Sequence, residues 1–355
     1  MSLARRSLAA FLACSLSSLV AASEREYTSS FVEVELKTLR PSNLDNDYVL
    51  FDLDNIAVFR ETPQGDLSNV DFDNELSAKI TVGQRFGHRS GWAVSYWDYD
   101  ESADADRSVG FIAPLFPDGV LVPTLISPGQ YCLLDPISGI VFSDCLNPVF
   151  TDAVAFHKIE ADTLDLYYWR TAIEQERFQL RWMAGVRFAS IDSRLEALYA
   201  GFDGGFAAVP QGTPIDGRAS LKSDAEGLGP MAGIHGAVRL GGRWRLVGGT
   251  TIAMLVGSVD ARYQADIDPD LDTFVPFDYD VAREEDRILT IIELSLGVEV
   301  EIGKRWRATL GYELARWEDS VDRLSFPDSL VTSFAETESI SVGWDGLKAG
   351  ASFEW

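Results

Sequence analysis

The sequence predicts an all-β protein: a single antiparallel transmembrane β-barrel of about ten strands, with eight or twelve strands left open. Three observations predict this class. Long segments alternate between apolar and polar residues, short basic turns followed by an aromatic residue separate several of them, and the chain ends in an alternating stretch with a terminal Trp. We expect short periplasmic turns, long extracellular loops, and both termini on the side of the short turns.

The N-terminal segment has the features of a secretory signal peptide. Arg5 and Arg6 precede an apolar, small-residue segment over 7–20, and small residues suitable for cleavage follow. We therefore expect residues 1–22 to be a signal peptide and residues 23–355 to be one barrel domain. A lipoprotein signal with Cys14 as the lipidated residue is the open alternative.

The composition excludes several classes of protein. The formal net charge of −25 argues against binding to nucleic acid. Hydrophobic residues make up 46% of the chain, yet no apolar run after the signal reaches the ~18 residues of a membrane-spanning helix. An exported chain of this kind is either a soluble β protein or an outer-membrane barrel.

The length of the alternating segments decides between these two classes. Over 178–190, "FQLRWMAGVRFAS", apolar residues occupy one face, while the opposite face carries Gln179, Arg181 and Arg187. Strands of soluble proteins usually run about five or six residues, whereas barrel strands need about 9–11 to cross the bilayer. The same pattern recurs over 76–86, 292–302 and 305–315.

Ten strands follow from the spacing of these segments. The first is uneven and is compatible with a kink. The expected strands are 28–50, 72–86, 92–101, 156–170, 177–191, 225–240, 243–259, 287–302, 305–318 and 339–355. The long, acidic connections are expected near 52–71, 102–155, 192–224, 260–286 and 319–338.

Four short turns have a common design. They are expected at 87–91, 171–177, 241–242 and 303–304, each with Arg or Lys in or beside it and an aromatic residue after it. Trp and its relatives favour the membrane–water boundary, so we expect an aromatic girdle at one rim. Ordinary hairpin turns with a packed ring are the alternative. The candidate girdle residues are Trp92, Phe178, Trp244, Trp306 and Trp355.

The chain ends "LKAGASFEW", alternating up to the terminal aromatic residue. Such an end is typical of the signal that the barrel-assembly machinery of bacterial outer membranes reads. The expected partners are that machinery, outer-membrane lipid and lipopolysaccharide, and small solutes or ions; the oligomeric state is left open.

The polar face of the strands is the candidate functional surface. In a pore, charged residues there set ion selectivity. The alternative is a mesh of buried ion pairs, because barrels near eight strands hold only side chains. The candidate pore-lining residues are Lys79, Arg85, Arg181, Arg187, Arg239, Arg243, Arg245, Glu293, Glu299, Glu301, Arg305, Arg307 and Glu313.

The remaining motifs are less specific. Cys132 and Cys145 are an even pair in an exported chain and predict a disulfide, with two buried thiols as the alternative. The histidines show no metal-site spacing, so no metal and no cofactor are expected. His235 falls on the lumen face without a nucleophile motif, so we expect no enzyme.

Four segments resemble the Legionella-type pore-forming outer-membrane protein family, which has planctomycete-type relatives. They are "VEVELKTLRPSN" (32–43), "GVRFASIDSRL" (185–195), "GLGPMAGI" (227–234) and "WDGLKAGASFEW" (344–355). The resemblance implies one outer-membrane barrel, pore formation and, in some members, surface adhesion. It supplies no catalytic residues.

The expected function is passive, porin-like diffusion of small solutes or ions across a Gram-negative-type outer membrane. A non-conducting structural or adhesive barrel that presents long acidic loops is the alternative. A barrel-embedded hydrolase would need a Ser or a carboxylate within reach of His235.

Overall fold

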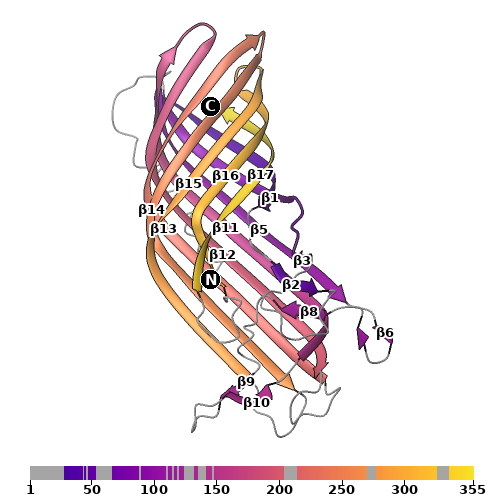
Figure 1. Ribbon diagram of the computed structural model, residues 1–355. Coiled ribbons are helices and arrows are strands. Elements are labelled where there is room, and N and C mark those ends of the chain that lie inside the picture. The colour runs from indigo at the N-terminus through magenta and orange to yellow at the C-terminus, as the bar shows by residue number, and fades with distance from the viewer. Residues whose placement is uncertain are drawn as a thin grey trace.

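Ten long strands form a closed antiparallel ring in the computed structural model (Figure 1). β11 pairs with both β5 and β12 and so closes the ring. The prediction of an all-β barrel of ten strands is confirmed. The ring strands are β1 (Thr28–Ser42), β4 (Glu75–Phe86), β5 (Ser90–Ser108), β11 (Pro148–Glu174), β12 (Phe178–Asp203), β13 (Pro214–Gly241), β14 (Trp244–Pro269), β15 (Phe277–Ile302), β16 (Trp306–Ser325) and β17 (Glu336–Glu354).

The structure describes only part of the chain. The described residues are 28–42, 44, 47–52, 66–87, 89–108, 111–113, 116–117, 120–123, 132–134, 141–145, 148–203, 214–269, 277–325 and 336–355. The expected signal peptide lies outside them and stays a prediction. Within these ranges, no helix is long and apolar enough to cross a membrane.

Small strands accompany the extracellular end. β2 (Asp47–Asp52), β3 (Asp66–Asn69) and β8 (Val120–Pro123) join the main sheet through the pair Phe150↔Leu121. The expected first strand is thus divided into β1 and β2. Two separate hairpins consist of β6 (Phe111–Ala113) with β7 (Phe116–Pro117), and β9 (Cys132–Leu134) with β10 (Val141–Cys145).

The turns at the opposite end are short. Gly242 and Gly303 have φ angles of 57° and 77°, a left-handed conformation that glycine adopts without a steric penalty. The expected turn at 171–177 is shorter than predicted, because β11 continues to Glu174 and β12 begins at Phe178. A register shift between Thr171 and Ile173 hides this last part of the strand from a simple alternation.

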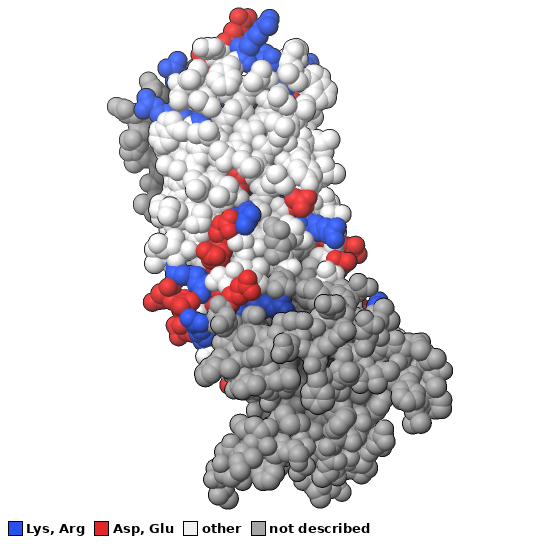
Figure 2. All heavy atoms as spheres, in the orientation of Figure 1, with Lys and Arg blue, Asp and Glu red and all other residues white. Residues whose placement is uncertain are grey.

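The outward face of the barrel has a sharp apolar boundary. Figure 2 shows a wall almost free of charged atoms between a charged rim and a second charged zone. One residue from each of six adjacent strands forms the last apolar row: Tyr96, Leu164, Phe188, Leu228, Val256 and Ile288. Two residues further along the same strands lie Asp98, Asp162, Ser190, Glu226, Ser258 and Asp286. The hydrocarbon zone therefore ends between these rows.

Beyond this boundary the strands continue, and their pattern inverts. On β12, Val186 faces outward and Arg187 inward, whereas further along Ile191 and Leu195 face inward and Asp192 outward. β14 changes in the same way. The predicted long loops at 192–224 and 260–286 are wrong over much of their length, because these residues extend β12–β15. The loop predicted at 102–155 is shortened only at its ends, where 102–108 extend β5 and 148–155 extend β11. Outside the bilayer the solvent is water, so apolar side chains turn to the interior.

The hairpin of β16 and β17 departs from the wall. The β15–β16 ladder ends at Thr290↔Glu318, although β15 stays paired with β14 as far as Phe277. Beyond a register shift that contains Asp319 (φ 55°), β16 pairs only with β17 among the described strands. β16 also contacts β12, β13 and β14, and the Asp322 N–H donates to Ser223 Oγ on β13, so residues 319–323 lie inside the barrel. We call residues 319–325 and 336–342 the inner hairpin.

Candidate functional site

The periplasmic mouth of the lumen is lined by alternating charges. Glu354 forms an ion pair with Arg85 at 3.1 Å and accepts a hydrogen bond from Arg307 at 3.2 Å. Arg245 contacts Glu299 at 3.5 Å and also pairs with Glu301. These side chains come from β4, β14, β15, β16 and β17, so the mouth is assembled by closure of the ring.

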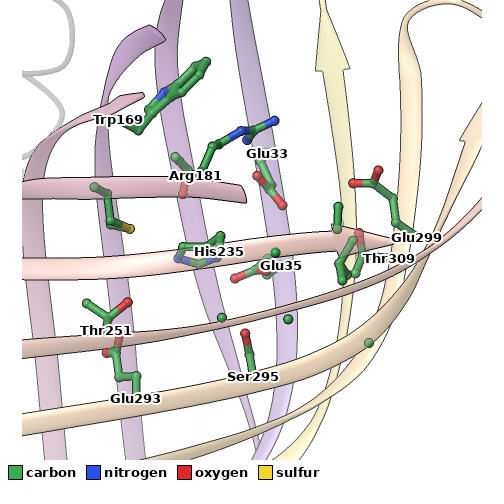
Figure 3. A pocket seen from close by; sticks show the side chains of 18 of the residues that line it. Glu33, Glu35, Trp169, Arg181, His235, Thr251, Glu293, Ser295, Glu299 and Thr309 are labelled. Atoms are coloured by element: carbon green, nitrogen blue, oxygen red, sulfur yellow. The ribbon is translucent and has the colours of Figure 1, made fainter. Parts of the chain in front are cut away.

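A cavity of about 270 Å³ lies behind this mouth. Glu33 and Glu35 project into it from β1, and Arg181 and His235 project from β12 and β13 (Figure 3). Strict alternation along "VEVEL" places both glutamates inward, because Val32, Val34 and Leu36 face outward on the same strand. One wall of the cavity therefore carries carboxylates, and another carries a guanidinium.

Two aromatic rings in the cavity wall rest on glycines. A β-carbon at Gly91 would lie 2.7 Å from the Trp169 ring, and one at Gly83 would lie 2.6 Å from the Phe31 ring. Neither distance is compatible with a side chain larger than hydrogen. The two glycines on β5 and β4 thus allow Trp169 and Phe31 to lie flat against the barrel wall beside the cavity.

Ion pairs form the next layer. Arg187 donates to Asp165 at 2.6 and 2.8 Å and to Glu293 at 2.8 and 3.1 Å, and its exposed fraction is 1%. On the opposite side, Glu313 pairs with Lys37 and, at 3.4 Å, with Lys348. Charges on facing strands are thus neutralised in pairs, which buried charges require.

An aromatic layer crosses the lumen above the ion pairs. Trp344 lies at its centre, with its ring centroid 5.1 Å from Trp317, 6.0 Å from Trp97 and 6.2 Å from Tyr99. All four rings are at most 6% exposed. They come from β5, β16 and β17, and edge-on packing of this kind favours close contact. This layer and the inner hairpin fill the lumen between the cavity and the extracellular end.

Most predicted lumen residues lie around the cavity. Those that line it are Lys79, Arg85, Arg181, Arg187, Arg245, Glu293, Glu299, Arg307 and Glu313. Glu301 reaches the mouth through its pair with Arg245. Arg239, Arg243 and Arg305 are exposed at the turn end and do not line the cavity. These arginines lie at the ends of strands, and alternation alone does not show how deep in the lumen a residue lies.

The prediction missed several lumen residues. Glu33, Glu35 and Lys37 share the inward face of β1, and Lys348 lies on β17 opposite Lys37 in the register. Strict alternation in "VEVELKTL" was the available signal. The aromatic layer was missed because its members are distributed over three strands that are distant in sequence.

The aromatic residues at the turn end face outward in part. Trp244, Trp306 and Trp355 are 51–54% exposed, and the Trp306 ring lies 4.7 Å from that of Phe353. Phe178 and Trp92 are half-buried. The rings thus occupy one rim, the position at which an interfacial girdle is expected.

The histidines occupy different levels of the lumen. His235 lines the cavity, and no hydroxyl bonded to it is found among the described residues. His157 Nε2 lies 2.9 Å from Ser193 Oγ, but both are buried beside a cavity of only about 10 Å³. In the described part of the chain, His157 Nδ1 lacks a partner that would orient the ring for base catalysis, and no group of three or more His, Cys, Asp or Glu residues is placed to hold a metal.

The two cysteines are brought together by the backbone. Cys132 and Cys145 are direct register partners in the β9–β10 hairpin. Their side chains lie outside the described part of the structure, so the disulfide stays a prediction.

Comparison with known proteins identifies a family that the chain matches. The family model described as "Legionella pneumophila major outer membrane protein precursor" matches residues 26–354. None of the curated protein sequences compared with the chain matches it.

Solved structures with a similar course of the chain are outer-membrane proteins. The outer membrane protease OmpT from Escherichia coli is 12% identical, with 94% of this chain and 100% of that chain covered and a TM-score of 0.42. A Pseudomonas aeruginosa FadL homologue is 8% identical, with 92% and 90% covered and a TM-score of 0.29. The P. putida toluene transporter TodX is 7% identical, with 92% and 89% covered and a TM-score of 0.30. These values are too low to carry an argument about function.

Proposed function

The chain belongs to the family of the Legionella pneumophila major outer membrane protein, and from this premise we propose that it is a narrow, porin-like channel for small solutes or ions. The observation that carries the proposal is the charged cavity behind the periplasmic mouth, with Glu33 and Glu35 facing Arg181 and His235. Opposed charges on two walls of a passage orient and select charged solutes. The proposal gives the barrel no catalytic step.

The aromatic layer is the constriction of this channel. Trp344 contacts the other three rings, so passage requires these rings to move aside or leaves only a narrow path beside them. We therefore expect a low conductance for the wild-type barrel. Lipid, lipopolysaccharide and the barrel-assembly machinery remain the proposed partners of its outer surface and C-terminal strand.

The test is single-channel conductance in planar bilayers, with wild-type protein and Trp344→Ala. Removal of the central indole opens a cavity in the aromatic layer, so we expect severalfold larger conductance steps. Trp306→Ala is the matched control, because it removes an indole from the outward face and leaves the lumen unchanged. If neither wild type nor Trp344→Ala conducts while both migrate as folded barrels, the channel proposal fails.

A non-conducting structural or adhesive barrel is the second candidate. The specific observation in its favour is that the aromatic layer and the inner hairpin both lie inside the lumen. The same conductance experiment separates the two functions, because a permanently filled barrel conducts neither as wild type nor as Trp344→Ala.

A further inference from the structure

Two guanidinium groups converge on one indole in the cavity. Arg181 Cζ lies 4.8 Å from the centroid of the Trp169 ring, and Arg85 Cζ lies 5.8 Å from it. Arg85 also lies 5.4 Å from the Phe31 ring. Cation–π contacts hold both groups at the cavity wall while leaving their N–H edges available. Glu354 offsets the charge of Arg85 through its ion pair.

Both arginines have hydrogen-bond donors that are not used. In the described part of the chain, Arg181 has one long bond, 3.4 Å from Nη2 to Gln179 Oε1, and no carboxylate at ion-pair distance. Arg85 pairs with Glu354 through Nη1, but its buried Nε has no partner among the described residues. By contrast, Arg187 deeper in the lumen is fully engaged by two carboxylates. Both side chains line the cavity, but the Arg85 Nε is itself enclosed by protein, so only the terminal N–H groups of the two guanidinium groups can reach a ligand there.

The cavity has room and an apolar surface beside these donors. Its volume of about 270 Å³ is just below the usual size of pockets for drug-sized molecules, and therefore suits a smaller ligand. Phe31, Trp169 and Met183 supply apolar area at the same level. A ligand with one anionic group and a small apolar body matches both features.

We propose that this cavity binds the carboxylate group of a small organic acid, with Arg181 and Arg85 donating to its oxygens and Trp169 and Phe31 contacting its apolar body. Guanidinium and carboxylate have matching geometry, and a bond between charged partners is among the stronger hydrogen bonds. Glu33, which faces Arg181, opposes the anion and limits its affinity. The inference rests on the proposed function, because the acid would reach the site through the lumen.

The test is isothermal titration of the refolded barrel with benzoate at constant ionic strength. Benzamide, which has the same shape without the charge, is the ligand control. We expect benzoate to bind and benzamide to bind at least about tenfold more weakly, because only the carboxylate uses the arginine donors. Equal binding of the two ligands would overturn the proposal in favour of a merely apolar pocket.

Protein variants locate the site. Arg181→Gln should weaken benzoate binding about tenfold, and Arg181→Lys should be intermediate because it keeps the charge without the planar fork. Arg170→Gln is the matched control: Arg170 lies on the neighbouring strand β11 at a similar level but is exposed on the outward face. Glu33→Gln should tighten binding. A loss in Arg170→Gln equal to that in Arg181→Gln, or weaker binding in Glu33→Gln, would overturn the proposal.

Titration does not depend on conduction, so the two proposals fail separately. Benzoate binding to a barrel that never conducts would leave the site in place and remove the channel. A conducting barrel that does not bind benzoate would support the channel and remove the binding site. Comparison of heated and unheated samples on gels establishes that each variant is folded before titration.

Discussion

Arg187 shows how much a single residue contributes to the interior of the barrel. It joins Asp165 on the neighbouring strand to Glu293, which is 106 positions away in sequence. Its removal would leave two carboxylates without their principal partner in the lumen. A buried charge that loses its partner is strongly destabilising, unlike one at the surface.

We therefore predict that Arg187→Leu lowers the free energy of unfolding by about 3–5 kcal/mol. Urea titration in detergent, followed by loss of β signal in circular dichroism, measures this change. The control is Arg194→Gln, which breaks an outward, half-exposed pair with Glu196 on the same strand and should change stability by about 1 kcal/mol or less. Equal effects of the two substitutions would contradict the assignment of Arg187 as the main structural cation.

Alternation predicted the faces of residues but not their partners. Arg187 and Glu293 were both placed on the lumen face from their own strands. That they meet depends on the curvature of the ring, which brings β12 and β15 close across the lumen. The contact of Arg181 with the Trp169 ring could not be predicted either. The position of that ring depends on Gly91, which lies on another strand.

At the level of elements, the inner hairpin is the least regular part of the barrel. Arg287 on β15 donates to Asp322 at 2.6 and 2.9 Å and to Ser339 at 2.6 Å. The backbone N–H of Asp322 donates to Ser223 Oγ on β13 at 3.0 Å. These bonds fasten the hairpin to two different strands of the wall.

Asp322→Asn should release this hairpin. It keeps the size of the side chain but removes the charge that Arg287 pairs with, and hydrogen bonds to charged groups contribute about 1.5–3 kcal/mol. Amide hydrogen exchange over 319–325 and 336–342 should accelerate about tenfold or more. Asp280→Asn breaks a comparable but exposed pair with Arg262, and should leave exchange in the hairpin unchanged. Unchanged exchange in Asp322→Asn would mean that packing alone holds the hairpin.

The sequence predicted where β16 leaves the wall of the barrel, but not the direction that the chain takes beyond that point. Alternation ended the expected strand at 318, and the β15–β16 ladder does end at Glu318. Nothing local in "DSVDRL" indicates that the chain turns into the lumen, because its anchors lie on β13 and β15. The lengths of other strands were underestimated for a related reason. Their alternation continues beyond the membrane, but there the apolar residues face inward and the charged residues outward.

At the scale of the whole molecule, the barrel has two zones with different solvents. One faces lipid and carries apolar residues outward, and the other faces water and carries charges outward. Asp192 and Asp224 belong to the second zone, where they are direct register partners on the outward face. Partial burial, and then a hydrogen bond and charge from Asp224, raise the pKa of Asp192 from 3.8 to about 7.

This raised pKa predicts that the outer zone is more stable in acid. A carboxyl group that binds its proton more tightly in the folded state stabilises that state below its ordinary pKa. The contribution therefore decreases as the pH rises from about 4 to about 7. Cleavage by thermolysin within 190–226, relative to a peptide standard at each pH, should be faster at pH 8 than at pH 5.5.

Asp192→Asn should abolish this pH dependence, because the amide does not titrate. Asp216→Asn, on β13 of the same zone, is the control and should retain it. If wild type is cleaved at equal relative rates at both pH values, the proton at Asp192 is not coupled to folding of this zone.

The sequence by itself determined the class of the protein, a ring of about ten strands and the face on which most charges lie. These follow from period-two alternation, because a strand presents successive residues to opposite solvents. Only the tertiary structure decided the length of the strands beyond the membrane, the inner hairpin, the aromatic layer and the cavity. Each of these depends on contacts between strands far apart in the chain, which ring closure creates and no local pattern records.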